Sequence, residues 1–485
     1  MPSSIDHTNL HRTAKYFMDN GRAASPEAAI ELLHQFGLTI QAGAELMHSP
    51  AHQIALLTLV NTARRTFLGG VEIVGLPDAA SLSNLVPNQS LENAVQRLGG
   101  RLVHEQKPGW PYAVIGTPRQ SVDGAPAWQL TWEGWRGGVI PLRENVRLAE
   151  DDTLGIAPVL AAASCAAEVF AYHAGDHPMA GRRSSGMSLW RPGAAWRLAD
   201  ANEPALAYLP SRLWMIGLGN LGQAFAWLLG CLPFPTAPRP VIVLQDFDSI
   251  TAANESTSVL TSPRELGRKK TRVVAKWLEA RGFDTIIEER RFGPWIRRTD
   301  DEPGAALCGV DNALARASLE KAGFGLIVEA GLGAGPQGFR NIFMHTFPAS
   351  RAAADLWSNE ALSASNVEQM PAYQALRRKG VDACGLAQLA SRTVAVPFVG
   401  MAAGCLVLSE LLRRLHGGHG LEVASISLLS LDDVETVTTV IAPYPFGHVP
   451  KAAQSTSMPN RGVYAHVSAD TTTLAGVAVE RASRP

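Results

Sequence analysis

Residues 213–222 read LWMIGLGNLG, a short apolar run followed by glycines in the spacing Gly-x-Gly-x-x-Gly. The apolar run predicts a buried strand, and residues 223–232 continue as an apolar, helix-like segment. A second apolar run at residues 241–244 leads into the acids Asp246 and Asp248. Strand, glycine turn, helix, strand and acid in this order predict a nucleotide-binding half of a doubly wound α/β sheet.

Each part of this pattern has a physical role at a nucleotide. Gly217, Gly219 and Gly222 let the backbone turn tightly and approach a phosphate, which then lies at the positive end of the following helix. A carboxylate at the end of the second strand is placed to accept hydrogen bonds from ribose hydroxyls. Because a glycine fingerprint alone is a weak signal, the residues after it decide which nucleotide is expected.

The composition is that of a globular protein with two or three domains. The chain has 485 residues, 46% of them hydrophobic, and a formal net charge of -1. Near-zero net charge argues against nucleic-acid binding, and no apolar run approaches the roughly 20 residues needed to span a bilayer. The N-terminus shows no signal peptide. The five cysteines are dispersed, which predicts no disulfide framework and favours a reduced, cytoplasmic protein.

Breaks in the pattern divide the chain into two halves and a tail. Glycine and proline interrupt residues 175–210, so we place one half at residues 1–205 and the second at residues 206–420. Polar material indicates an insertion at about residues 340–395. Strand-like segments and then a mobile end are expected at residues 421–485.

The two halves show a limited likeness to each other. Small-residue helices are predicted at residues 157–171 and 400–415, and each closes one half. A diverged duplication would produce this likeness, and the first half would then have lost its phosphate loop, because it lacks the glycine motif. Two unrelated α/β domains explain the sequence equally well.

Two further features favour a triphosphate over a dinucleotide. A long polar loop follows Asp248, and Lys270 then lies at a basic helix start, within reach of the phosphate loop. Asp311 ends the next core strand, and a carboxylate at this edge of the sheet is where a magnesium ion is expected. The motif Gly-x-x-x-x-Gly-Lys-Ser/Thr is absent from the sequence, which excludes a P-loop ATPase.

The chain resembles the ubiquitin-activating enzyme superfamily, which includes the ThiF and MoeB type adenylating enzymes. The resemblance covers residues 213 to about 418, and its combination of motifs is specific. The matching residues, in the order of the family, are Gly217, Gly219, Gly222, Asp246, Asp248, Asn254, Lys270 and Asp311.

The resemblance implies a Rossmann-like adenylation domain that uses ATP and Mg²⁺ to activate the C-terminal carboxylate of a ubiquitin-like protein. Asp246 or Asp248 would hold the ribose, Lys270 the phosphates and Asp311 the Mg²⁺, with Asn254 in the same cofactor site. Lysine, metal and helix dipole would neutralise the charge that develops on the transferred group.

One position departs from the family pattern. The family usually has an arginine three residues after the asparagine matched by Asn254, and Thr257 stands there instead. Either Arg264 or Arg268 compensates, or the phosphate contacts are rearranged. A non-catalytic binding partner with a decayed site is therefore one alternative.

In the family the adenylating unit works as a dimer or a pseudodimer, and an arginine from the other half reaches the ATP. The resemblance therefore implies that the first half is a degenerate, inactive adenylation-like domain, paired with the active one in a single chain. A homodimer also stays open. The candidates for the crossing arginine are Arg22 and Arg12, of which Arg22 is included in the predicted cofactor site, and Arg64 and Arg65 are alternatives.

Conjugating members of the family pass the activated carboxylate to a cysteine. Cys384 is the predicted acceptor, because it lies among small residues at the end of the polar insertion, where a flexible crossover would carry its thiol over the adenylate. The other cysteines lie in apolar helices or at the end of a buried strand and are expected to be packing residues; they are Cys165, Cys231, Cys308 and Cys405.

The function expected is therefore adenylation of a ubiquitin-like protein, thioester formation on Cys384 and hand-over to a conjugating enzyme. The resemblance is to bacterial members, which are common in antiphage defence. One alternative is a sulfur-carrier adenylyltransferase of cofactor biosynthesis, which often carries paired zinc-binding cysteines that this sequence lacks. Another is an NAD-dependent oxidoreductase, which leaves Lys270 and Asp311 unexplained. No nucleic acid and no membrane is expected as a partner.

Overall fold

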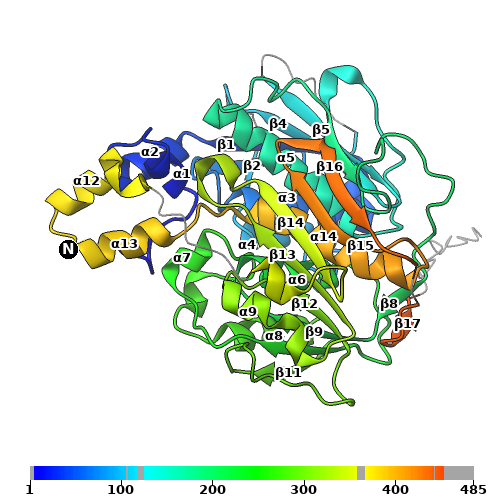
Figure 1. Cartoon of the computed structure of the whole chain (residues 1–485). Helices are drawn as coiled ribbons and strands as arrows, with labels where there is room; N and C mark the ends of the chain where they lie inside the picture. The colour runs from blue at the N-terminus through cyan, green and yellow to red at the C-terminus, as the bar shows by residue number, and fades with distance from the viewer. Residues whose placement is uncertain (1–4, 105–106, 118–124, 358–365, 442, 453–485) are drawn as a thin grey trace, which may run out of the picture. The chain divides into compact units, whose positions relative to one another are not determined.

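The computed structural model describes residues 5–104, 107–117, 125–357, 366–441 and 443–452. It contains two large α/β sheets, one in each half of the chain (Figure 1). The mobile end expected beyond residue 452, and part of the predicted insertion, lie outside the described residues.

The second sheet is built from β9 (Arg212–Ile216), β10 (Val241–Gln245), β11 (Asp284–Glu288), β12 (Ala305–Cys308), β13 (Leu326–Leu332), β14 (Asn341–Phe347), β15 (Leu421–Ser427) and β16 (Ser430–Thr438). Their order is β11-β10-β9-β12-β13-β14-β15-β16. The strands from β11 to β13 run parallel, and β14 to β16 extend the sheet as antiparallel strands. The strand predicted at residues 213–216 is β9, the middle one of the five parallel strands. The apolar run predicted at residues 241–244 is β10, its neighbour. The expected α/β sheet with crossover connections is confirmed.

The first sheet is built from β1 (Gly37–Ala42), β2 (Gly70–Val74), β3 (Arg101–Val103), β4 (Tyr112–Ile115), β5 (Ala127–Glu133), β6 (Arg136–Pro141) and β7 (Ser185–Ser188). Their order is β3-β2-β1-β4-β5-β6-β7, parallel from β3 to β5 and antiparallel beyond. In both sheets the first strand is central, the next two lie on one side and the following two on the other. A separate short ladder pairs β8 (Tyr208–Pro210) with β17 (His448–Pro450).

The helices are α1 (Lys15–Asp19), α2 (Pro26–His34), α3 (Pro50–Ala63), α4 (Leu91–Arg97), α5 (Ile156–Ala174), α6 (Asn220–Gly230), α7 (Ala252–Glu255), α8 (Lys270–Glu279), α9 (Ala313–Ala317), α10 (Gly335–Gly338), α11 (Ala353–Leu356), α12 (Pro371–Arg378), α13 (Ala383–Ser391) and α14 (Pro397–Leu415). Two of them begin with the same local signal, a serine cap followed by proline. Ser25 accepts a hydrogen bond from the backbone of Ala28, and Ser49 accepts one from the backbone of His52.

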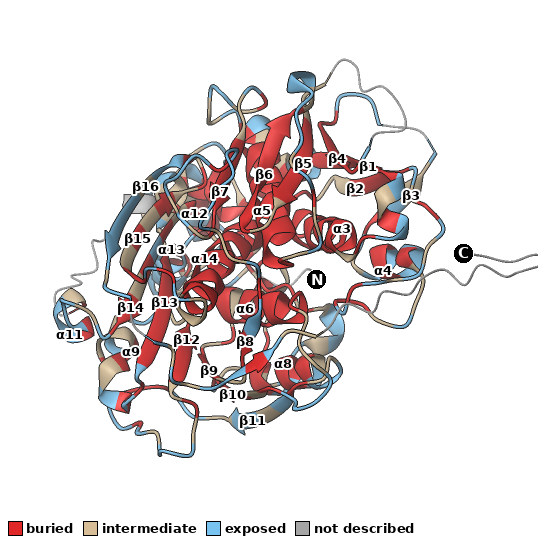
Figure 2. Cartoon of the chain, turned by 90° about the vertical axis from the view of Figure 1, so that its right-hand side faces the viewer, coloured by how far each residue is buried: buried red, intermediate tan, exposed pale blue. Residues whose placement is uncertain are grey.

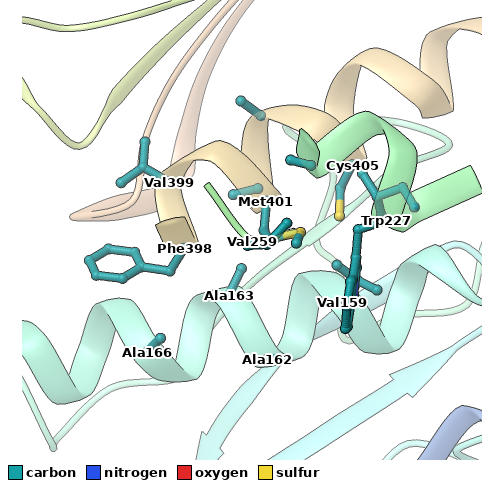
Figure 3. Close-up of a cluster of buried hydrophobic side chains, with 14 of the residues drawn as sticks. Val159, Ala162, Ala163, Ala166, Trp227, Val259, Phe398, Val399, Met401 and Cys405 are labelled. Carbon is teal, nitrogen blue, oxygen red and sulfur yellow. The ribbon is translucent and has the colours of Figure 1, made fainter. Parts of the chain in front are cut away.

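A layer of buried helices joins the two sheets (Figure 2). Figure 3 shows the alanines of α5 directed toward α14, where Phe398 and Met401 fill the space beside them. Small side chains let the two helices approach closely. Phe398 is fully buried, and burying such a side chain contributes roughly 1.5–3 kcal/mol.

Helix α5 corrects one expectation from the sequence. Its 19 residues are long and apolar enough to cross a membrane by length and composition, although no such run was expected. In the structure 89% of its most apolar window is buried inside the protein. Its apolar character is therefore explained by its place in the core.

Hydrogen bonds inside this core also connect the halves. The indole Nε1 of Trp227 on α6 donates to Thr58 Oγ1 on α3 at 3.0 Å. The side-chain amide of Asn61 donates to the carbonyl of Val259 at 3.1 Å. Both bonds are buried, so the halves share polar contacts as well as apolar packing.

The insertion before α14 is anchored to the start of the chain, where α12 packs on α1 (Figure 1). Asp19 Oδ1 accepts hydrogen bonds from Lys15 Nζ and from the Tyr373 hydroxyl, both at 2.7 Å. All three side chains are buried. An exposed ion pair, Lys379 to Glu27 at 2.7 Å, adds a second contact. The N-terminal helices therefore support the segment that carries Cys384.

Thr58→Val tests the polar contact between the halves. The change keeps the shape of the side chain but leaves the buried indole N–H of Trp227 without its acceptor. We expect the free energy of unfolding to fall by about 1–3 kcal/mol, measured by urea unfolding followed by circular dichroism. Thr62→Val is the matched control, because the Thr62 hydroxyl donates to carbonyls of its own helix. Equal losses in the two variants would contradict the role given to Thr58.

Candidate nucleotide-binding site

The glycine turn lies between β9 and α6, at the C-terminal edge of the second sheet. Gly217 has φ of +81°, a left-handed conformation that favours glycine. A Cβ on Gly222 would lie 2.0 Å from the Gly217 carbonyl oxygen, so α6 leaves the turn too closely for a side chain. A Cβ on Gly219 would meet no atom within 4 Å. The turn is thus packed on its inner side and open at Gly219, as a phosphate requires.

The two acids after β10 have different surroundings. The carboxylate of Asp246 is buried and accepts hydrogen bonds from the backbone N–H of Leu218, at 2.7 Å, and of Asp248, at 2.8 Å. The side chain of Asp248 is 47% exposed. Asp246 therefore shapes the glycine turn, and Asp248 is the carboxylate with room to meet a ribose.

Lys270 lies at the start of α8 and points back to these acids. Its Nζ is 2.8 Å from Asp248 Oδ2 and 3.9 Å from Asp246 Oδ2. Its backbone N–H also donates to the carbonyl of Asp248, at 3.1 Å. The long polar loop after Asp248 thus returns to the same edge of the sheet, and the structure brings together the three predicted residues.

Asn254 shapes the loop between these points. Its side-chain oxygen accepts a hydrogen bond from the backbone of Thr251, at 2.8 Å, as part of a capping box on α7. Thr257, which replaces the family arginine, is buried, and its hydroxyl lies 3.5 Å from the Asn254 carbonyl. Thr257 therefore packs inside the loop.

Asp311 follows β12 and lies next to the glycine turn. A Cβ on Gly217 would contact Val310 and the backbone of Gly309, which shows how closely the two segments approach. Asp311 is exposed, whereas the next residue, Asn312, caps α9 by accepting from the backbone of Ala315. Among the described residues no cluster of three or more metal-binding side chains occurs. A lone carboxylate fits Mg²⁺, which is commonly held by one or two carboxylates and the phosphates of its nucleotide.

Sequence reasoning missed the side chains that hold this segment from behind. Arg316 Nε donates to the carbonyl of Val310, at 3.0 Å, and lies 3.5 Å from Glu329 Oε2. His345 Nδ1 lies 2.5 Å from the other oxygen of Glu329. Glu329 is fully buried. A single acid within an otherwise apolar strand was the available signal, since a buried carboxylate requires a partner.

Arg12 connects the N-terminal segment to this site. Its backbone N–H donates to Ser256 Oγ, at 3.1 Å, and its guanidinium donates to the carbonyl of Thr393, at 2.6 and 2.8 Å. Burial and the charge of Arg392 lower the pKa of Arg12 to about 10, and the carboxylate of Asp311 opposes this shift. The hydrogen bonds of Arg12 thus place the N-terminal segment between the loop at Ser256 and the segment before α14.

The other arginine candidates lie elsewhere. Arg22, which was included in the predicted cofactor site, donates to the carbonyl of Ala174 at the end of α5 and lies over the ring of Phe17. Arg65 is buried and donates to backbone carbonyls of the loop at residues 255–261, while Arg64 lies 3.4 Å from Glu255. Arg65 thus crosses between the halves but is engaged in holding a loop.

Cys384 is exposed, and it lies in the first turn of α13, which corrects its expected position in a loop. The side chain of Asp382 caps this helix by accepting from the backbone of Gly385, at 2.7 Å. The four other cysteines are buried. Burial raises the pKa of Cys308 to about 12 and also raises the pKa of the rest. An α-helix rises about 1.5 Å per residue, so Cys384 lies roughly 10 Å along α13 from the end of the helix at Ser391. That end of α13 is close to Thr393, the residue to which Arg12 is hydrogen-bonded.

The equivalent edge of the first sheet is filled by its own side chains. After β1, the carboxylate of Glu45 accepts hydrogen bonds from the backbone and hydroxyl of Thr117, which follows β4. Arg147 Nη2 lies 3.6 Å from Glu45. Burial raises the pKa of Glu45, but the hydrogen bonds from Thr117 and the charge of Arg147 outweigh it and lower the pKa to about 2. A carboxylate thus occupies the crevice between the central strands.

Two family models match the chain. One, described as the BilD C-terminal domain, matches residues 209–418, and the other, described as the BilD N-terminal domain, matches residues 37–189. A bacterial E1-like protein named BilD, from Collimonas sp. (strain OK412), is 59% identical over 449 residues, which are 92% of this chain and 97% of that protein. The class that these matches define is that of the E1-like proteins, which confirms the predicted superfamily. Within that class, the chain belongs to the BilD family.

Solved structures of E. coli MccB show a partial likeness. One, titled MccB with ATP, has a TM-score of 0.30 and 12% sequence identity, and covers 48% of this chain and 65% of that chain. Another, of MccB, has a TM-score of 0.31 at 14% identity, and covers 48% of this chain and 63% of that one. The chain thus spans just under two thirds of the length of the MccB chains.

Gly222→Ala tests the geometry of the turn. Its methyl group would overlap the Gly217 carbonyl, so α6 would have to shift, and we expect a loss of about 1–3 kcal/mol or more in the free energy of unfolding. Gly219→Ala is the matched control, because its methyl group enters open space. We expect it to change stability by no more than about 0.5 kcal/mol. Thermal unfolding measures both, and a Gly222→Ala variant as stable as the control would refute the packing described.

Proposed function

We propose that the chain activates a ubiquitin-like protein by adenylating its C-terminal carboxylate with ATP. The observation that supports this most is that two separate segments meet at the glycine turn, while the N-terminal segment is hydrogen-bonded to the loop that follows Asp248. Arg12 comes from the N-terminus, Lys270 from the start of α8 and Asp311 from the end of β12. The E1-like relative at 59% identity points to the same chemistry.

The reaction joins a carboxylate to a phosphate. An oxygen of the incoming C-terminus attacks the α-phosphorus of ATP, an acyl–adenylate bond forms, and pyrophosphate leaves as its bond to that phosphorus breaks. Lys270 and Arg12 are placed to neutralise phosphate charge, and Asp248 to orient the ribose. Asp311 would hold Mg²⁺, which supplies charge neutralisation at the phosphates.

Arg12 is our candidate for the cation that takes over from the family arginine, whose position is occupied here by Thr257. The backbone of Arg12 is hydrogen-bonded to Ser256, the neighbour of Thr257, so the N-terminal segment lies beside that position. Arg268 is a weaker candidate, because it is paired with Glu265 at 2.7 Å. Arg264 has no described contact with the loop of Thr257. We infer that a cation from the first half replaces the family arginine.

The first half is proposed to be a degenerate copy that has lost nucleotide binding. The shared strand order of the two sheets supports a diverged duplication. Glu45 and Thr117 fill the edge at which a nucleotide would bind, and the half-buried carboxylate of Glu45 would repel phosphates. The chain would then be a pseudodimer in which one half catalyses and the other contributes Arg12.

Thioester formation would be the second step. The thiolate of Cys384 would attack the acyl carbon of the adenylate, forming a thioester as AMP leaves. Its exposure supports this role, but its place in the first turn of α13, away from the end of the helix near Arg12, requires α13 to move toward the site. The ubiquitin-like protein would then pass to a conjugating enzyme in the bacterial cytoplasm, within an antiphage pathway.

Arg12→Ala should lower ATP–pyrophosphate exchange by about 100-fold or more, because one cation is lost from the developing phosphate charge. The assay uses purified protein, Mg²⁺ and a matched ubiquitin-like protein. Arg22→Ala is the control and should stay within about twofold. Arg12→Lys keeps the positive charge but cannot reproduce both hydrogen bonds from the guanidinium to Thr393, and it should retain part of the activity. This variant separates the effect of the charge from the effect of those hydrogen bonds. A loss in Arg22→Ala with none in Arg12→Ala would reverse the assignment.

Cys384→Ala should abolish a reductant-sensitive conjugate with the ubiquitin-like protein and leave ATP–pyrophosphate exchange within about twofold, because adenylation precedes transfer. Cys384→Ser should give a conjugate that resists reductant, since an oxyester replaces the thioester. Gel electrophoresis with and without reductant reads out both. Persistence of the conjugate in Cys384→Ala would place the acceptor elsewhere. Exchange without any conjugate in the unmodified protein would favour the sulfur-carrier alternative.

A further inference from the structure

A cation-rich cavity of about 280 Å³ lies between the two halves. The first half contributes the end of α3 and part of α4, and the second contributes α6, α8 and the loop at residues 259–262. Its described lining does not include Asp248, Lys270 or Asp311, so it is distinct from the nucleotide site. The basic side chains of the lining are Arg64, Arg65, Arg97, Lys276 and Arg281.

Acidic side chains do not balance these cations in the described part of the chain. Glu265 is the acid of the lining, and its carboxylate is 2.7 Å from Arg268, outside the lining. Glu255 is 3.4 Å from Arg64. Among the described residues, no carboxylate lies within ion-pair distance of the four other cations, which are Arg65, Arg97, Lys276 and Arg281.

Arg281 is held rigidly at this cavity. It donates to the carbonyls of Trp277 and Leu85, and its guanidinium stacks 3.6 Å from the Trp277 ring. Burial and the charge of nearby Arg97 lower the pKa of Arg281 to about 9. Arg97 and Arg281 both line the cavity, and their like charges repel each other.

Unpaired donors accompany this excess of charge. The Nε atoms of Arg64 and Arg281 are buried and have no hydrogen-bond partner among the described residues. A buried donor without a partner costs roughly 1–3 kcal/mol. An anion in the cavity would reduce the repulsion between the cations that line it.

We propose that this cavity binds an oxyanion of the phosphate class, either free inorganic phosphate species or the phosphate group of a nucleotide. Guanidinium groups match phosphate through paired N–H donors. The cavity is near the lower end of ligand-site volumes, about 300–1,000 Å³, which suits a small anion. Because both halves line it, binding would strengthen the contact between them. The inference does not depend on the proposed adenylation.

The test is isothermal titration calorimetry with pyrophosphate and, separately, AMP. Both probes can also enter the nucleotide site, so the titrations are repeated on Lys270→Ala. The test variant is Arg97→Ala/Lys276→Ala, in which both residues are exposed and folding should be unaffected. Arg101→Ala/Arg272→Ala is the control with the same change in charge, since both arginines are exposed and lie outside the lining.

We expect a binding event that persists in Lys270→Ala and in the control, and that weakens at least tenfold in Arg97→Ala/Lys276→Ala. A response to pyrophosphate alone would identify a free inorganic ligand, and a response to AMP would identify a nucleotide phosphate. The proposal is overturned if neither probe binds outside the nucleotide site, or if Arg97→Ala/Lys276→Ala binds as tightly as the control.

Discussion

The packing of α5 against α14 is the contact on which the rest of the structure depends. Alanines on α5 let the two helices approach closely (Figure 3), and the sheets of both halves pack on this shared layer. The same contact brings the N-terminal segment of the first half to the edge of the second sheet. Arg12 acquires a place beside Ser256 because the two halves share one core. On a separate domain, its side chain would be an ordinary surface charge.

The two sheets use the same strand order for different purposes. At the edge of the second sheet, Asp246 holds a glycine turn that is open at Gly219. At the edge of the first sheet, the carboxylate of Glu45 accepts hydrogen bonds from the backbone N–H and the hydroxyl of Thr117. A closed hydrogen-bonded pair suits a supporting half, and an open turn surrounded by charge suits a catalytic one. The asymmetry supports one active site per chain.

Local patterns in the sequence predicted the second half well. The strand at residues 213–216, the glycine turn and the positions of Asp246, Asp248 and Lys270 all follow from the order of neighbouring elements, and a parallel sheet aligns the ends of its strands. The serine-proline starts of α2 and α3 are equally local signals. Such features depend on residues that are close in the sequence, so they can be predicted without knowledge of the three-dimensional fold.

Long-range contacts explain what the sequence did not predict. Choosing Arg12 over Arg22 depends on how residues 8–20 pack against the loop near residue 256, which no local pattern encodes. The contacts that support Asp311 also join separate elements. Arg316 on α9 donates to the carbonyl of Val310, and Glu329 on β13 lies beside Arg316. The helical position of Cys384 follows from the Asp382 cap, a short-range signal that the glycines nearby obscured.

The central claim is that one chain assembles one adenylation site from both of its halves. The most direct measurement is a crystal structure of the protein with Mg²⁺ and a non-hydrolysable ATP analogue. The account predicts a nucleotide at the glycine turn, with its phosphates between Lys270 and Arg12 and the metal on Asp311. A nucleotide beside Glu45 on the first sheet, or Asp311 and Arg12 both turned away from the phosphates, would contradict it.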